Sequence, residues 1–184
     1  MSKNIWITSD LHFGHKNICA GSSNWEDRST CRPFSSADEM DEVLIENWNS
    51  CVKPKDLVWV LGDWAMCKEE KAKHITNSLN GTKYIVLGNH DRKPHKMVEM
   101  GFTQTRRHYL TEVGGLNILM HHKPRGKLVQ EIEYDILLHG HQHSRNKISG
   151  TTSINMCVEA WDYTPVPAEE VYIIARALRD KNRR

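Results

Sequence analysis

The chain has 184 residues, 39% of them hydrophobic and 26% charged, with a formal net charge of +2. This composition predicts one globular domain over 1–184. The sequence shows neither an apolar run near the ~20 residues that span a bilayer nor an apolar leader, so a cytoplasmic protein is expected. The five cysteines are odd in number and include no CxxC pair, which argues against a disulfide framework and against structural zinc on thiolates.

The first half of the chain alternates predicted strands and helices. The strands are short apolar runs rich in β-branched residues, and the helices show apolar residues at helical spacing. In chain order the elements are the strand IWIT at Ile5, a helix that begins at a capping box of Ser36 and Glu39, the strand LVWVLG at Leu57, a helix over about 66–79, and the strand YIVLG at Tyr84. This alternation predicts parallel strands in an α/β sheet.

The second half is richer in predicted strands. The apolar runs are LNILMHH at Leu116, DILLHG at Asp135 and VYIIA at Val171. A basic tail follows at 176–184, and such a tail is more often a solvated terminus than an arm that binds nucleic acid.

Unusual polar residues follow five of the predicted strands. Ligand sites of open α/β sheets gather at the carboxyl ends of strands, so residues far apart in the sequence can converge there. A buried cluster of carboxylates and imidazoles is costly without an ion, and a metal removes that cost. The residues are Asp10 and His12, Asp63, Asn89 with His90 and Asp91, His121, and His141 with His143.

The number and type of these side chains point to a particular kind of metal site. Seven of these side chains, two aspartates, four histidines and one asparagine, are donors that suit two cations with one shared carboxylate. Imidazole and carboxylate donors without thiolates favour divalent transition ions over Mg²⁺ or Ca²⁺. We expect manganese first, with iron, zinc or nickel as alternatives. Two such ions can activate a bridging water for displacement at phosphorus, so the cluster predicts a phosphate-ester substrate.

The order and spacing of these motifs resemble the calcineurin-like metallophosphoesterase superfamily. Asp10-x-His12, Gly62-Asp63, Gly88-Asn89-His90-Asp91, His121 and Gly140-His141-x-His143 occur in the order of that superfamily. The segments DLHFGHKNI, RPF, NWNS and WDYTPVP further resemble its small, uncapped bacterial and phage-type members. The resemblance implies an α/β fold, a four-layer α-β-β-α sandwich with a dinuclear metal site at the strand carboxyl ends.

The resemblance also implies roles for individual side chains. Asp63 would bridge the two ions, and His90 would protonate the leaving oxygen while Asp91 accepts a hydrogen bond from its other ring nitrogen. Gly88 and Gly140 would let the backbone approach the site. The ligands of the first ion would be Asp10, His12, Asp63 and His143. The coordination of the second ion would be completed by Asn89, His121 and His141.

Neighbouring histidines compete for these roles. His121 and His122 point to opposite faces of an extended segment, so only one can enter the site; motif order favours His121 and leaves His122 structural. His139 is expected in the core or in a turn, whereas His141 and His143 would each serve a different ion.

Substrate contacts are less determined by the sequence. His15 either contacts the substrate phosphate or caps the segment that follows it. Lys123 and Arg125 either clamp a phosphate or are simply solvated. Trp64 and Trp161 could stack on a nucleobase, but tryptophans beside apolar runs more often pack in the core.

These observations predict a metal-dependent phosphoric ester hydrolase. Because the site is expected to be shallow and uncapped, a phosphodiesterase is favoured, acting by direct attack of a metal-bridging hydroxide, on a substrate that could be a nucleotide or a nucleic-acid end. The alternatives are a phosphomonoesterase or nucleotide phosphatase at the same site, and a scaffold protein that has lost catalysis. All seven donors and His90 are present, which disfavours the scaffold.

Overall fold

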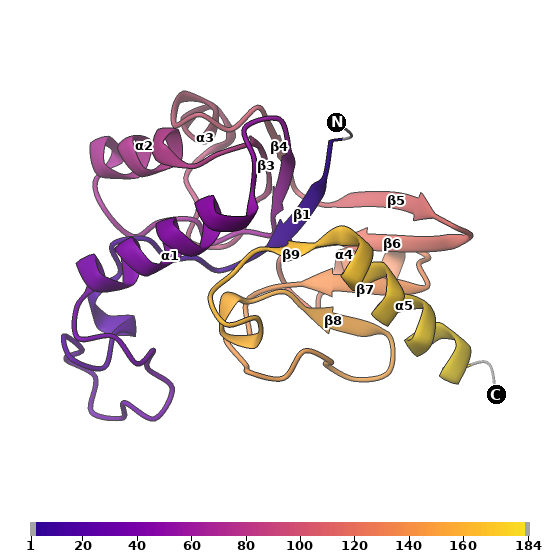
Figure 1. Ribbon diagram of the computed structural model, residues 1–184. Coiled ribbons are helices and arrows are strands. Elements are labelled where there is room, and N and C mark those ends of the chain that lie inside the picture. Colours follow the sequence, from indigo (N-terminus) through magenta and orange to yellow (C-terminus); the bar gives the residue numbers. More distant parts are fainter. Residues whose placement is uncertain (1–2, 183–184) are drawn as a thin grey trace.

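The computed structural model describes residues 3–182, in which two β-sheets lie face to face between helices (Figure 1). The first sheet has the strand order β4-β3-β2-β1-β9. Strands β1 to β4 are parallel, and the short β9 runs antiparallel beside β1. The bounds are Ile5–Thr8 for β1, Leu57–Val60 for β2, Thr82–Val86 for β3, Gln104–Arg106 for β4 and Val166–Pro167 for β9.

The second sheet has the strand order β5-β6-β7-β8. A two-glycine turn at Gly114 and Gly115, both with positive φ, joins the antiparallel pair β5 and β6. The remaining pairs are parallel, so β6 and β7 end at the same edge. The bounds are Tyr109–Val113 for β5, Leu116–Met120 for β6, Ile136–His139 for β7 and Ser153–Asn155 for β8.

Three helices cover the outer face of the first sheet. They are α1 (Ala37–Cys51), α2 (Glu69–Ser78) and α3 (Pro94–Glu99), and their apolar faces share one buried cluster with β2 and β3. The helix α1 begins as predicted, because Ser36 accepts a hydrogen bond from the Glu39 backbone N–H at 3.1 Å. The Glu39 carboxylate returns to the backbone N–H of Ser35, one residue before the N-cap.

A second apolar cluster fills the space between the sheets. Ile7 and Val86 from the first sheet meet Ile118 and Leu138 from the second, and all four are fully buried. The helix α4 (Lys127–Glu131) covers the outer face of the second sheet, where Val129 packs with Leu119 and Leu137 in a separate small cluster. The layers are therefore helices, sheet, sheet and helix, which confirms the predicted four-layer sandwich.

The predicted strand at Val171 is wrong, because this run lies inside the helix α5 (Ala168–Asn182). Val171 and Ala175 are one helical turn apart and pack into the cluster between the sheets, while Ile173 is exposed. A short run of apolar residues is compatible with either structure, and the acidic first turn of α5 at Glu169 and Glu170 is the helical signal.

Other element boundaries also differ from expectation. The second helix begins at Glu69, after the predicted start at Met66, and the short elements β4, β5, β8, β9, α3 and α4 were not predicted. The basic tail continues α5 as far as Asn182, and Arg183 and Arg184 lie outside the described residues. No helix within residues 3–182 is both long and apolar enough to cross a bilayer.

Candidate metal centre

The turns after five strands converge where the two sheets meet, and backbone hydrogen bonds fix them to one another. The Asp10 N–H donates to the carbonyl of Gly62 at 3.0 Å, which joins the turns after β1 and β2. The His141 N–H donates to the Asp10 carboxylate at 3.0 Å, which joins the first sheet to the turn after β7. The predicted convergence at the carboxyl ends therefore occurs across both sheets.

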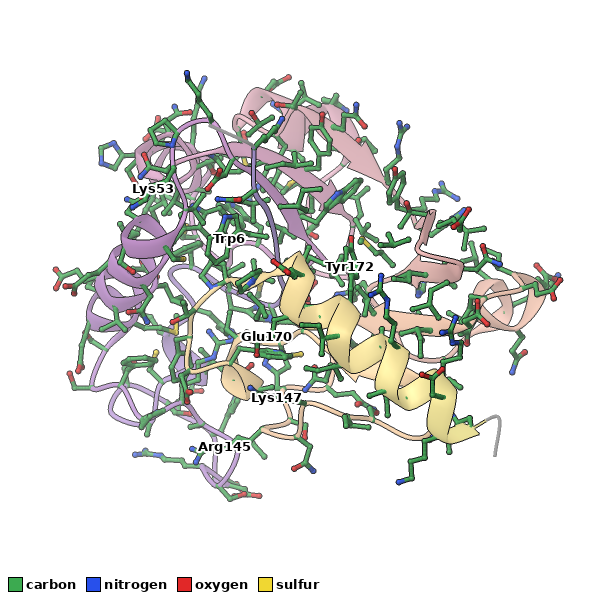
Figure 2. All side chains as sticks on the ribbon, turned by 45° about the vertical axis from the view of Figure 1, so that its right-hand side comes forward. Trp6, Lys53, Arg145, Lys147, Glu170 and Tyr172 are labelled. Carbon is green, nitrogen blue, oxygen red and sulfur yellow. The ribbon has the colours of Figure 1, made fainter. Side chains whose placement is uncertain are left out.

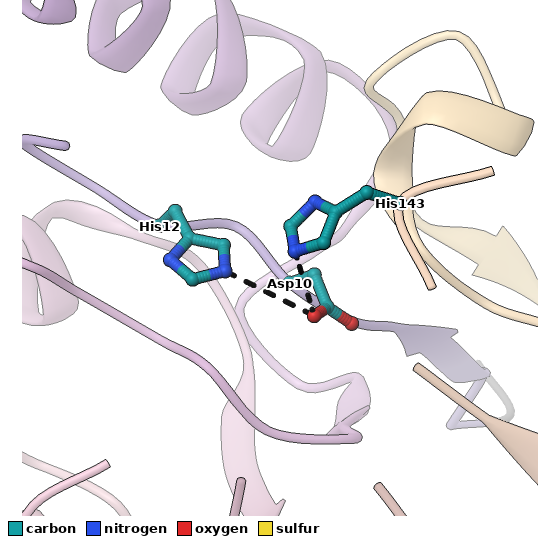
Figure 3. Close-up of side chains that lie close together, drawn as sticks. All are labelled: Asp10, His12 and His143. Carbon is teal, nitrogen blue, oxygen red and sulfur yellow. Dashed lines mark ion pairs between the residues drawn. The ribbon is translucent and has the colours of Figure 1, made fainter. Parts of the chain in front are cut away.

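One group of side chains with metal-ligand character consists of Asp10, His12 and His143 (Figure 3). The Asp10 Oδ1 atom lies 3.9 Å from His12 Nε2 and 3.4 Å from His143 Nε2. Two donors that each lie about 2.1 Å from a common ion are about 3.0–3.5 Å apart at tetrahedral or octahedral angles. The spacing is therefore close to that of donors around one ion.

His12 gives the clearest test of whether a cation fits this group. Both of its ring nitrogens are buried and lack a hydrogen-bond partner in the described part of the chain. Burial lowers the pKa of His12 to about 2, so the imidazole is neutral and keeps a lone pair. A buried polar side chain without partners is costly, and an ion bound to its lone pair would remove that cost.

The second group consists of Asp63, His122 and His141. The Asp63 Oδ2 atom lies 3.4 Å from His122 Nε2 and 3.6 Å from His12 Nε2 of the first group. The Asn89 Oδ1 atom is 3.1 Å from His122 Nε2. Burial favours a higher pKa for Asp63, but the neighbouring His122 outweighs it and holds the pKa below its usual range. Asp63 is thus an ionised carboxylate between the two groups.

The backbone of this centre is strained. Seven non-glycine residues have positive φ in the described chain, and five of them belong to the two groups. Such conformations are uncommon outside glycine and cluster at functional sites, where the surrounding structure enforces them. The five are Asp10, His12, Asp63, His141 and His143.

Two glycines let the backbone come close to the aspartates. A Cβ atom on Gly140 would overlap the Asp10 carboxylate, and one on Gly88 would overlap that of Asp63. The expectation that these positions require close backbone approach is confirmed. Larger side chains here would displace the carboxylates.

The two adjacent histidines are placed the other way round from the expectation: His122 faces the second group, and His121 does not. His122 is buried beside Asp63, and its Nδ1–H donates to the carbonyl of Leu61 at 2.8 Å, so Nε2 faces the second group. The ring of His121 points elsewhere and donates to the carbonyl of Lys123 at 2.7 Å. His122 continues the strand face of Ile118 and Met120, which looks toward the other sheet, and alternation excludes His121 from that face.

His90 lies at the exposed rim of the centre, with its ring centroid 5.6 Å from that of His12. Asp91 does not accept a hydrogen bond from that ring in the described residues, contrary to expectation. Its carboxylate accepts from the backbone N–H groups of Asp63, Trp64 and Gly88 at 2.7–2.9 Å. Burial still raises the pKa of Asp91. Asp91 therefore holds the turns after β2 and β3 together.

Glu159 and Arg32 support the first group and were not identified from the sequence. The Glu159 Oε1 atom accepts from His143 Nδ1 at 2.7 Å and from the buried Arg32 guanidinium at 2.8 Å. Arg32 also donates to the carbonyl of Leu11 at 2.8 Å. Burial alone would raise the pKa of Glu159, but Arg32 and His143 lower it to about 2. The resulting carboxylate orients His143 with Nε2 toward Asp10.

His15, one of the predicted substrate contacts, lies beside the centre, with its ring centroid 5.3 Å from that of His12. Burial lowers the pKa of His15. Lys123 is exposed. The burial of His141 lowers the pKa of His141, and the nearby charges of His122 and Lys123 lower it further. Arg125 is exposed in the loop before α4, and no contact among residues 3–182 brings it to the two groups.

The packing interpretation holds for the remaining aromatic and histidine candidates. Trp64 is buried against Phe13, and its indole N–H donates to Thr76. Trp161 is buried too, and Lys147, which lies near Glu170 at the start of α5 (Figure 2), places Nζ 4.0 Å from its ring centroid. His139 is fully buried in β7 and bonds the Gly140 carbonyl, and burial lowers its pKa.

Known proteins share both the sequence and the fold. The model of the calcineurin-like phosphoesterase superfamily domain matches residues 4–156. "Uncharacterized protein MJ1445" of Methanocaldococcus jannaschii is 31% identical over 172 residues, which cover 89% of this chain and 86% of that protein. "Gene 66 protein" of Mycobacterium phage D29 is 31% identical over 199 residues, covering 91% and 94%. The crystal structure of protein AQ665 from Aquifex aeolicus, described as of unknown function, has a TM-score of 0.72 at 25% identity and covers 94% of this chain and 100% of that one.

Proposed function

This chain belongs to the calcineurin-like phosphoesterase superfamily, and from that premise we propose that it is a dinuclear metal-dependent phosphodiesterase. The observation that carries the proposal is the position of Asp63, whose Oδ2 atom lies within 3.6 Å of donors from both groups. A carboxylate shared in this way suits a bridging ligand. The coordination of the first ion would be completed by Asp10, His12 and His143, and that of the second ion by Asn89, His122 and His141.

When bound, two divalent ions would supply a hydroxide nucleophile at neutral pH and neutralise charge on the phosphate, with manganese favoured over iron, zinc or nickel. The protein positions the remaining groups. The His90 backbone N–H donates to Asp63 Oδ1 at 2.9 Å, so the rim residue is fixed relative to the bridging carboxylate. The exposed His90 ring can then donate a proton to the oxygen that leaves phosphorus.

The shape of the centre favours a diester over a monoester. His90, His141 and Asn89 are exposed, so one face of the centre is open to solvent. An open face leaves room for both ester arms of a phosphodiester. The substrate class of the proposal is therefore a phosphodiester.

The test is hydrolysis of bis-p-nitrophenyl phosphate and of p-nitrophenyl phosphate by the manganese-loaded protein, followed by released nitrophenolate. We expect faster turnover of the diester. Asp63→Ala should abolish turnover, and His90→Ala should lower kcat by about 10²–10⁴-fold, the usual contribution of a general acid.

The adjacent histidines provide a matched pair of variants. His122→Ala should lose turnover, and His121→Ala should keep it, because only His122 faces Asp63. Faster turnover of the monoester would replace the proposal by a phosphomonoesterase. Metal binding without hydrolysis of either ester would replace it by a scaffold on the same fold. Unchanged turnover in Asp63→Ala would contradict the assigned site.

A further inference from the structure

Trp25 differs from the other tryptophans in its exposure. Its relative exposure is 40%, whereas Trp6 is half-buried and Trp48, Trp59, Trp64 and Trp161 are buried. An indole ring is a large apolar surface, and leaving it in water forgoes much of the stabilisation that its burial would give. Rigid exposed aromatic rings are often contact surfaces for ligands.

Trp25 lies close to the metal centre through a row of rings. Its ring centroid is 6.0 Å from that of His15, which is 5.3 Å from that of His12. The angle between the Trp25 and His15 planes is 76°, an edge-to-face arrangement. Trp25 is therefore two ring contacts away from His12, a candidate ligand of the first ion.

The loop that carries Trp25 is anchored at both ends. The Ala20 N–H donates to the carbonyl of Arg32 at 2.9 Å, and the Gly21 N–H donates to that of Phe34 at 3.0 Å. Within the loop, the Trp25 N–H donates to Ser23 Oγ at 3.1 Å. Because Arg32 also bonds the Leu11 carbonyl beside the centre, the base of the loop is fixed relative to Asp10 and His12.

There is room for a ligand beside His15. A cavity of about 510 Å³ opens between the loop after β1 and the start of α2, and its lining includes His15, Lys16, Met66 and Lys68 but not Trp25. This volume is within the range of small-molecule sites. Met66 is 39% exposed, and the Nδ1 atom of His15 is buried without a partner in the described residues.

The charges beside Trp25 differ in sign from those beside the cavity. Glu26 and Asp27 follow Trp25 in the loop, and carboxylates disfavour a phosphate there. Lys16 and Lys68 line the cavity and are exposed, so positive charge lies on the His15 side. The surface at Trp25 thus suits an uncharged planar ring rather than a second phosphate.

We propose that Trp25 and His15 form a stacking subsite for the nucleobase of the substrate, which makes the preferred ester one of a nucleotide. The inference rests on the proposed function, because the subsite adjoins the centre that would hold the phosphate. Every base has an aromatic face, so stacking recognises nucleotides without selecting a sequence.

The test compares the affinities of adenosine 5′-monophosphate and methyl phosphate for the manganese-loaded protein by isothermal titration calorimetry, with chromatography to verify that each ligand stays intact. The wild type should bind the nucleotide about 5- to 150-fold more tightly, the range for one stacked base. Trp25→Ala should abolish this preference without changing the affinity for methyl phosphate. Trp25→Phe should keep most of it.

Ile173→Ala is the matched control, since Ile173 is an exposed apolar residue on α5. A second readout is quenching of tryptophan fluorescence by the nucleotide, which Trp25→Phe should lose while it still binds. Equal affinities of the wild type for the two ligands, or equal weakening of both in Trp25→Ala, would overturn the subsite. Failure to hydrolyse any diester would contradict the proposed function alone, because these affinities are measured without turnover.

Discussion

At the scale of single residues, the candidate ligands are held by a second layer of hydrogen bonds. Glu159 orients His143, and Leu61 orients His122 through its carbonyl. In both histidines Nδ1 is engaged, so Nε2 is the atom left to face the centre. Little in the sequence indicates Glu159, because a single glutamate in a short 3-10 helix has no motif around it.

Glu159→Gln tests this second layer. The amide keeps the shape but removes the charge that orients His143, so the affinity for Mn²⁺ should fall by about 10–100-fold. Arg32 would also lose its buried partner, so the free energy of unfolding should fall, by up to about 3–5 kcal/mol. Metal titration and chemical denaturation measure these two effects. Glu169→Gln, an exposed acid on α5, is the control, and equal metal affinity in both variants would contradict the assigned role.

At the scale of elements, a buried lysine donates hydrogen bonds to backbone carbonyls at the end of a helix. Lys83 in β3 donates from Nζ to the carbonyls of Leu79 and Gly81 at 2.6 and 2.9 Å, just after α2 ends. These carbonyls would otherwise lack partners at the helix end. Burial lowers the pKa of Lys83 from 10.5 to about 8.

This shift makes the stability depend on pH in the alkaline range. The folded state releases the Lys83 proton near pH 8 and the unfolded state near 10.5, so between these values the unfolded state binds more protons. Stability contributed by this group therefore rises with pH in that window. From pH 7.5 to 9.5 the metal-free wild type should gain about 2 kcal/mol relative to Lys83→Met in urea denaturation. The exposed control Lys127→Met should show no such gain, and parallel pH profiles for Lys83→Met and the wild type would refute the burial effect.

At the scale of the whole molecule, the candidate centre joins the two sheets. Asp10, His12 and Asp63 follow strands of the first sheet, and His122, His141 and His143 follow strands of the second. An ion bound by either of the two groups would be held by side chains that move apart when the chain unfolds. Metal binding should therefore stabilise the fold itself.

Metal addition should raise the melting temperature. At a free Mn²⁺ concentration 100 times the Kd, one site contributes about 2.7 kcal/mol, which corresponds to roughly 5–11 °C for a protein of this size. Differential scanning calorimetry with and without a chelator measures the shift. Asp63→Ala should lose most of it and His121→Ala should retain it. No shift in the wild type at saturating metal would contradict a centre that joins the sheets.

The sequence by itself determined the elements with strong local signals and the set of strand ends that carry the chemistry. The capping box at Ser36 and the buried strands at Ile5 and Leu57 depend on neighbours within a few residues. The aspartates and histidines after the strands were identifiable because parallel strands end at a common edge.

Tertiary structure alone decided the features that depend on what packs against what. The run at Val171 is helical because its apolar positions one turn apart meet the cluster between the sheets, and the run itself suits either structure. His122 faces Asp63 because the opposing sheet lies on that side of β6. Arg32 and Glu159 meet across 127 positions of the chain, a contact that no local pattern can encode.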